Sequence, residues 1–254
     1  MNRRQLPGLL ALVFLVGCGA TPLSSRYAAE KRLYRAREVL ERIANKPEAA
    51  SALREEAIED FKALLNDFPL SRAQGDRVET HALGSVRTMA AVHLSNLYRD
   101  QKQRKEAIAA LRSVRGETKG DPDLALKIHG ELIALLSRPL EADSLVDVLR
   151  DCAEQLSPAD ADGRPIPLVI EAPLQVVDLL QSVGEETRAK FELENARAYY
   201  EDVARKHAGT ETEVVARIEL AKVALRQGRV DDADQLLSEV RGLAAAQRYE
   251  GAIL

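Results

Sequence analysis

The sequence is short of aromatic side chains and of cysteine. Phe, Trp and Tyr together make up 4% of its 254 residues, Trp is absent, and there are two cysteines. A core so poor in aromatic rings must be packed from Ala, Leu and Val, which suits close contact between helices. Long runs that alternate apolar and polar residues, as half-buried strands do, are also absent. These absences favour an all-α protein.

The sequence also lacks the patterns that carry enzyme chemistry. It has no HExxH motif, no Gly-rich phosphate loop and no GxSxG elbow. Its four histidines are scattered, at positions 81, 93, 129 and 207. Acid pairs such as Glu55-Glu56 and Asp231-Asp232 fall where helices are expected to begin, and there they suit the helix dipole. We therefore expect a non-enzymatic protein with no catalytic residues, no metal site and no cofactor.

The N-terminus reads as a secretory signal. Arg3 and Arg4 form a basic segment, and the apolar run Leu9–Val16 is far shorter than the about 20 residues needed to span a bilayer. Leu15-Val16-Gly17-Cys18 resembles a bacterial lipobox, which implies cleavage before Cys18 and acylation of that residue. The alternative is a plain signal peptide with an incidental cysteine. We predict a lipoprotein signal peptide over 1–17, then the lipidated Cys18 and a tether over 18–26.

The mature chain would be attached to a membrane by its acyl chains rather than by charge. Removal of residues 1–17 leaves 34 basic against 40 acidic residues, with no basic block that would favour nucleic acid. Gly19 follows the acylated position, and by analogy with Gram-negative lipoproteins the absence of Asp there implies the outer membrane, facing the periplasm. Cys152 would then be the sole thiol, in an apolar helical pattern that indicates a core residue.

The clearest structural pattern is Arg217–Val240, which reads as two short helices joined at Gly228. Small residues would let the two helices approach closely, and Gly228 suits a turn with positive φ. With Ala221, Gly228, Ala233 and Leu237 in their places, the stretch resembles a tetratricopeptide repeat (TPR). Membership of that family implies a right-handed superhelical solenoid of stacked helix pairs.

Further copies of the pattern extend over most of the chain. Residues 47–69 carry the second-helix order of the family, and residues 138–149 parallel 229–240. The marker alanines of the second helices are 57, 107, 142, 196 and 233, and two of the gaps between them lie near the period of 34 residues. We predict about five helix pairs over 27–254, with irregular insertions near 70–84 and 157–173. Leu168–Ile170 in the second insertion is expected to be a brief extended piece.

In the TPR family one face of each first helix lines a groove for a peptide or a partner helix. On matching positions the resemblance implies a groove formed by Met89, Val92, Asn96, Arg99, Leu124, Lys127, Glu131, Ile218, Lys222, Leu225 and Arg226. This mixture would suit a partly apolar peptide that carries acidic groups. The alternative is that these are ordinary solvent-facing positions.

Size, lipobox, short tether and helix pairs together resemble the TPR lipoproteins of the outer-membrane β-barrel assembly machine. The expected function is a scaffold that binds protein partners in the cell envelope. A pilotin or export accessory lipoprotein is a second binding hypothesis. An envelope enzyme acting on peptidoglycan is the rival from another class, and it requires carboxylates that converge in a cleft; a purely structural spacer is a further alternative.

Overall fold

The computed structural model describes residues 25–73, 77–118, 121–137 and 141–243. Within these ranges the chain is helical, apart from turns and one isolated bridge between Ala159 and Pro165. The helices form five pairs: α1 Ser25–Asn45 with α2 Ala50–Asp67, α3 Arg77–Asp100 with α4 Arg104–Arg115, α5 Pro122–Leu136 with α6 Ala142–Gln155, α8 Ala172–Ser182 with α9 Glu186–Lys206, and α10 Glu211–Arg226 with α11 Val230–Arg241. Three short elements are η1 Pro47–Ala49, η2 Leu70–Ala73 and α7 Pro167–Ile170.

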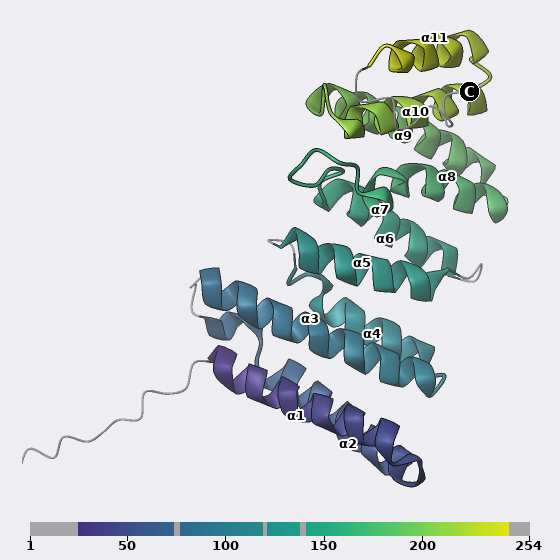
Figure 1. The fold of residues 1–254 in the computed structure, drawn as a ribbon. Helices are drawn as coiled ribbons and strands as arrows, with labels where there is room; N and C mark the ends of the chain where they lie inside the picture. The colour runs from purple at the N-terminus through teal and green to yellow at the C-terminus, as the bar shows by residue number, and fades with distance from the viewer. Residues whose placement is uncertain (1–24, 74–76, 119–120, 138–140, 244–254) are drawn as a thin grey trace, which may run out of the picture.

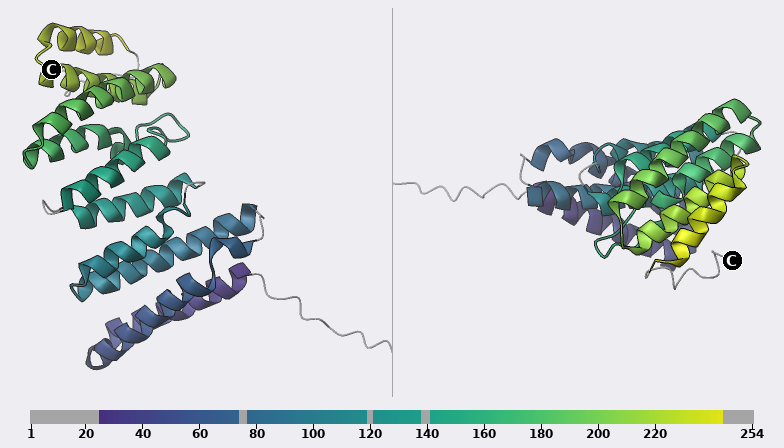
Figure 2. Two further views of the ribbon diagram at one scale, coloured as in Figure 1. Left: turned by 180° about the vertical axis from the view of Figure 1, so that it is seen from behind. Right: turned by 90° about the horizontal axis from the view of Figure 1, so that it is seen from above.

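The pairs stack one upon another, so the predicted all-α solenoid is confirmed (Figure 1). Seen along the stack, the helix directions turn from the first pair to the last, so the stack twists (Figure 2). Two large apolar clusters run through it, and Leu65 and Tyr98 pack against both. Each pair therefore buries its apolar faces against its neighbours, as a repeat protein does.

Small side chains permit this close stacking. Ala57, Ala107, Ala196 and Ala233 all lie on second helices and are essentially inaccessible to solvent, as predicted. Ala142 differs, because it is the first residue of α6 and is partly exposed. Leu145, three residues on, takes the buried place that Ala107 and Ala233 hold as fourth residues of α4 and α11.

Three of the tight turns between paired helices share one backbone conformation. Lys102, Gly184 and Gly228 have φ of 62°, 81° and 75°. In each turn the next residue donates its N–H to a carbonyl five residues earlier, as Arg229 does to Ala224 at 2.9 Å. Gly228 thus fulfils its predicted role, and Lys102 adopts the same left-handed conformation without being glycine.

Both predicted insertions are more helical than expected. The first ends early, because α3 already begins at Arg77; its polar residues lie on the outer face while Leu83 is fully buried. In the second, 167–170 forms α7 rather than an extended piece, with Pro167 at the first helical position and Val169 and Ile170 buried. The apolar run is short because it is a single buried turn of helix, which periodicity cannot distinguish from a strand.

The remaining loop, 157–166, forms a clamp between distant pairs. The carbonyl oxygen of Gly163 accepts hydrogen bonds from the amide and the hydroxyl of Thr212, at 3.3 and 3.0 Å. Thr212 lies in the first turn of α10, where amides have no partner within the helix. The loop after α6 thereby caps α10 and joins the third pair to the fifth.

Replacement of Gly163 tests this clamp. Gly163 has φ of 77°, and an added Cβ would lie 3.0 Å from Cγ2 of Thr210. We expect Gly163→Ala to lower the free energy of unfolding by about 2 kcal/mol, from left-handed strain and from this contact. Gly184→Ala is the matched control, because Gly184 has φ of 81° with nothing within 4 Å. Equal losses in urea denaturation would mean that the contact with Thr210 does not matter.

Arg87 on α3 is the main buried polar junction of the first half. Its guanidinium donates to the carbonyls of Leu65 and Phe68 at 2.5 and 2.8 Å, where α2 ends. It also pairs through two nitrogens with both carboxylate oxygens of Glu117, at 2.6 and 2.8 Å. One side chain thus satisfies the end of α2, and links it to α3 and to the segment between α4 and α5.

Removal of the Arg87 guanidinium should lower the free energy of unfolding. Arg87→Met leaves Glu117 and two carbonyls without their partner, and we expect a loss of about 3 kcal/mol in the free energy of unfolding. Arg32→Met is the control, since Arg32 and Asp67 form a partly exposed pair at 2.5 Å that is worth about 0–1 kcal/mol. Equilibrium urea unfolding measures both, and losses of similar size would contradict the role assigned to Arg87.

Candidate functional site

The first helices of the first three pairs, α1, α3 and α5, start at one edge of the molecule and lie next to one another (Figure 1). The starts of α1 and α3 are joined by a hydrogen bond from the amide of Arg26 to the carboxylate of Glu79, at 3.5 Å. Two hollows lie along these helices. The surface that contains both hollows is called the α1–α3–α5 groove.

The first hollow lies between α1 and α3 and has a volume of about 420 Å³. Glu30, Tyr34 and Arg37 line it from α1, and from α3 it is lined by Ala82, Ser85 and Met89, among others. On the α3 side, Ala82 and Ser85 are small and Met89 is flexible. A ligand could therefore approach the backbone of α3 closely.

The second hollow lies between the starts of α3 and α5 and measures about 720 Å³. Val78, Gly84 and Leu124 give it an apolar wall. His81 lines both hollows, and its Nδ1 lies 2.5 Å from a carboxylate oxygen of Asp121. The other oxygen of Asp121 accepts the amide of Leu124 at 3.2 Å, so this residue is the helix cap predicted from the sequence. The two hollows thus meet at His81.

Two cations on the helices of the groove pair with no acid in the described parts of the chain: Arg37, which lines the first hollow, and Lys127, one turn beyond Leu124 of the second. Arg37 on α1 and Lys127 on α5 are both exposed. They act on His93 of α3, whose pKa lies below its ordinary value because of burial first and these two charges second. His93 stacks on Phe61, with ring centroids 5.4 Å apart. The middle of the groove therefore carries positive charge from α1 and α5 beside a neutral imidazole.

The structure brings together only part of the predicted groove. Met89 lines the first hollow and Leu124 the second. Lys127 and Glu131 continue along α5, and partly exposed Asn96 accepts a hydrogen bond from Arg99 at 2.8 Å on α3.

The prediction that Val92 and Ile218 line a groove is wrong. They are 8% and 5% exposed, and Ile218 packs with Val214 and Val240. The other α10 residues lie outside the α1–α3–α5 groove: Lys222 pairs with Glu219 at 2.7 Å, Arg226 pairs with Asp178 of α8 at 2.6 Å, and Leu225 is half-exposed. The predicted set is therefore two separate surfaces rather than one.

The predicted set lacks the N-terminal end of the groove, because residues 70–84 are predicted as an insertion and the TPR resemblance implies no groove residue on α1. The available signal was the spacing of Val78, Ala82, Ser85 and Met89, which repeats at four, three and four residues. That spacing continues a single helical face about two turns before Ser85.

A further hollow of about 350 Å³ lies between α6, α8 and α9 and is lined by two carboxylates, Glu154 and Glu192. Glu192 is already engaged, by Arg150 through one oxygen and by Asn195 through the other at 3.3 Å. Glu154 is exposed, so this hollow holds one carboxylate that is already paired with a cation and one that faces solvent. In the described residues no cluster of three His, Cys, Asp or Glu could hold a metal ion, and no helix is long and apolar enough to cross a membrane.

Comparison with known proteins gives a likeness of fold at low similarity. No protein-family model and no curated protein matches the chain. A protein of Podosopora anserina named for the kinesin light chain and its nearly identical TPR-like repeats is 18% identical, with a TM-score of 0.43, and the match covers 85% of this chain and 98% of that one. A form of the same protein with one residue substituted is 16% identical, with a TM-score of 0.42, over 90% and 100%.

Cys152 is the buried free thiol expected from the sequence. Its Sγ lies 3.8 Å from the carbonyl oxygen of Leu168, and burial raises its pKa to about 12. A raised pKa keeps the thiol protonated at pH 8, and the thiolate is the reactive form. We expect Cys152 of the folded protein to resist a thiol reagent at pH 8 and to react fully in denaturing urea. Fast labelling of Cys152 without denaturant would show that this part of the core opens.

Proposed function

We propose that this protein is a lipid-anchored scaffold of a bacterial cell envelope that holds a segment of a partner protein in the α1–α3–α5 groove. The observation that carries the proposal is the pair of adjoining hollows, about 420 and 720 Å³, on the first helices of three successive pairs. Their combined volume, spread along three successive helices, suits a short helix or an extended segment rather than a small metabolite.

The chemistry of the groove indicates the kind of segment. Met89 and Leu124 offer apolar contacts. Arg37 at the first hollow, and Lys127 one turn beyond Leu124 on α5, offer charges that need no rearrangement to meet an acid. Exposed ion pairs are worth about 0–1 kcal/mol each, so apolar burial supplies most of the affinity and the cations select the register. The partner segment is therefore amphipathic, with acidic groups on the side that faces α1 and α5.

The envelope location rests on the sequence, in which Cys18 ends a lipobox and Gly19 follows it. Outer-membrane attachment facing the periplasm is the location that we propose. A core protein of the β-barrel assembly machine is the partner that we propose. The pilotin or export accessory hypothesis shares the same anchor and the same groove, and it differs in the identity of the captured protein.

Charge reversal in the groove tests the proposal. We expect Arg37→Glu with Lys127→Glu to reduce partner recovery from crosslinked membranes roughly tenfold, because two attractive contacts become repulsive. Lys105→Glu is the matched control, as Lys105 is an exposed cation on the second helix α4, outside the groove. Thermal unfolding of the double variant, the control and the unsubstituted protein checks that the fold is kept.

Mass spectrometry of the captured protein separates the two binding hypotheses. A barrel-assembly core protein supports the proposed role, and a secretin or polysaccharide exporter supports the pilotin or export role. Recovery unaffected by the double reversal, or reduced as much by Lys105→Glu, would remove the groove as the binding site.

A further inference from the structure

The first half of α1 and the start of α3 expose three large apolar side chains. Tyr27, Tyr34 and Val78 are 50%, 65% and 70% exposed, and they are three of the seven large hydrophobic side chains exposed in the described parts of the chain. Exposed apolar groups scattered singly need no explanation, but a cluster at one end of a molecule indicates a contact surface.

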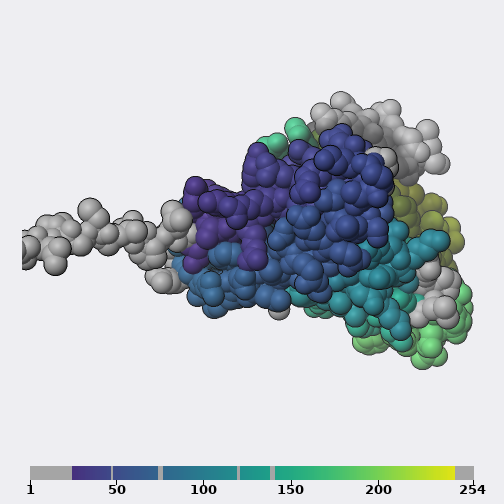
Figure 3. Space-filling view, turned by 90° about the horizontal axis from the view of Figure 1, so that it is seen from below, coloured from purple at the N-terminus to yellow at the C-terminus, as the bar shows by residue number. Residues whose placement is uncertain are grey.

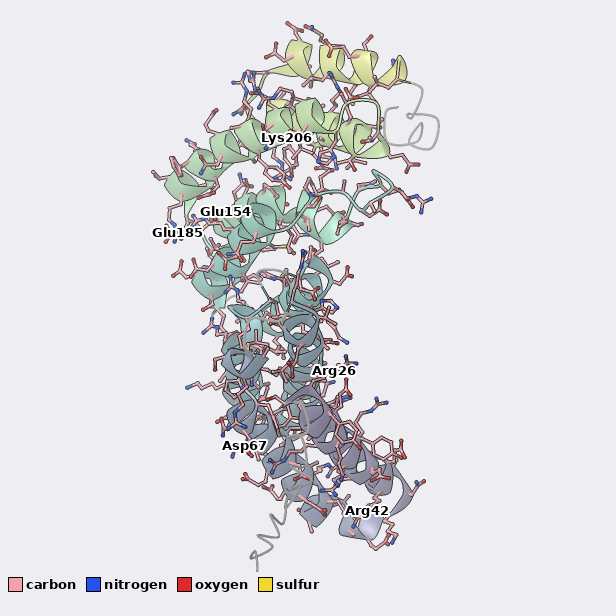
Figure 4. The ribbon with its side chains drawn as sticks, turned by 90° about the vertical axis from the view of Figure 1, so that its left-hand side faces the viewer. Arg26, Arg42, Asp67, Glu154, Glu185 and Lys206 are labelled. Carbon is pink, nitrogen blue, oxygen red and sulfur yellow. The ribbon has the colours of Figure 1, made fainter. Side chains whose placement is uncertain are left out.

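These three side chains belong to one end of the molecule. The hydrogen bond from Arg26 to Glu79 holds the starts of α1 and α3 together, at 3.5 Å. Tyr27 and Tyr34 are seven residues apart on α1, and so lie on the same side of the helix about 10 Å apart. Figure 3 views the stack from the α1–α2 end, and Figure 4 faces the edge at which α1 begins, with Arg26 marking that start and Lys206 far along the stack.

Cations border the same cluster. Lys31 and Arg77 are exposed, and neither pairs with an acid among the described residues. The acids nearby are already engaged: Glu30 accepts from the Arg26 guanidinium at 2.7 Å, and Glu79 accepts from the Arg26 amide. Tyr side chains beside free cations are the composition of a surface that meets lipid headgroups, because the ring is amphipathic and the cation pairs with phosphate.

The length of chain before α1 determines what this surface can reach. Cys18 precedes the first residue of α1, Ser25, by seven residues, which span roughly 25 Å when fully extended. If Cys18 is acylated, the start of α1 is held within that distance of the bilayer. The effective concentration of lipid at this surface is then high, so weak contacts suffice to orient the body.

We propose that the surface formed by Tyr27, Tyr34 and Val78, bordered by Lys31 and Arg77, lies against the anionic phospholipid bilayer that holds Cys18. The proposal rests on the lipid anchor of the proposed function. Its consequence is that the α1–α3–α5 groove opens beside the membrane, since Tyr34 lines the first hollow and Val78 the second. The partner segment would then be the membrane-proximal part of a membrane protein.

The absence of Trp from the chain permits a direct test. Single variants Tyr27→Trp, Tyr34→Trp and Val78→Trp each place one indole on the proposed surface. Phe191→Trp is the matched control, because Phe191 on α9 is 65% exposed, as much as Tyr34, and belongs to a later pair. The full lipidated proteins are reconstituted into vesicles of phosphatidylethanolamine and phosphatidylglycerol with acyl chains brominated near the headgroups, which quench indole on contact.

The proposal predicts that bromolipid lowers the emission of the three surface reporters roughly twofold or more, since indole at the headgroup level meets the upper acyl chains, and leaves Phe191→Trp unchanged. Vesicle flotation of the same samples reports the anchor separately. Flotation without quenching of the surface reporters would overturn the membrane-facing surface and leave the anchor in place.

If quenching or a blue shift of the emission appears only after partner protein is added, the surface contacts protein, and the proposal is overturned. Failure to float would overturn the anchor and this inference together.

Discussion

The buried guanidinium of Arg87 joins the first helix pair to the second and to the segment that leads on to α5. It satisfies carbonyls at the end of α2, belongs to α3, and pairs with Glu117 just after α4. In the first half of this solenoid the helices pack on neighbouring pairs, so no distant packing corrects an error in the angle between pairs. A side chain that makes several hydrogen bonds at once is satisfied in only one arrangement of its partners, whereas apolar contacts tolerate several arrangements. The shape of the α1–α3–α5 groove therefore depends on Arg87.

The second half of the chain is held by a different set of links between pairs. Arg188 of α9 pairs with Asp143 of α6 at 2.9 Å, and Arg226 of α10 pairs with Asp178 of α8 at 2.6 Å. The clamp from Gly163 to Thr212 adds a contact that skips a pair. Exposed ion pairs contribute little stability individually, but they oppose sliding of one pair over the next. These cations of the second half are thereby occupied, whereas Arg37 and Lys127 in the first half are available to a ligand.

Local signals in the sequence are enough for most of the helices and for their pairing, but not for the start of α3 or for α7. The small residues, Gly228 and the cap at Asp121 each specify one turn or one face, and these features depend only on near neighbours in the chain. The groove was predicted less well, because burial of a helix face depends on which helices pack against it. Val92 and Ile218 occupy family-like positions, yet the neighbouring helices cover them. The start of α3 was missed because its polar outer face dilutes the apolar period that Leu83 continues inside.

The α1–α3–α5 groove is proposed to hold a partner segment on the first helices, and crosslinking in cells tests this directly. A photo-activated crosslinking residue would be placed in turn at Ser85, in the first hollow, and at Glu106, exposed on α4. We expect the Ser85 position to yield one defined crosslinked envelope protein and the Glu106 position to yield none of it. Crosslinks to the same partner from Glu106 alone, or equally from both positions, would contradict a binding site in the groove.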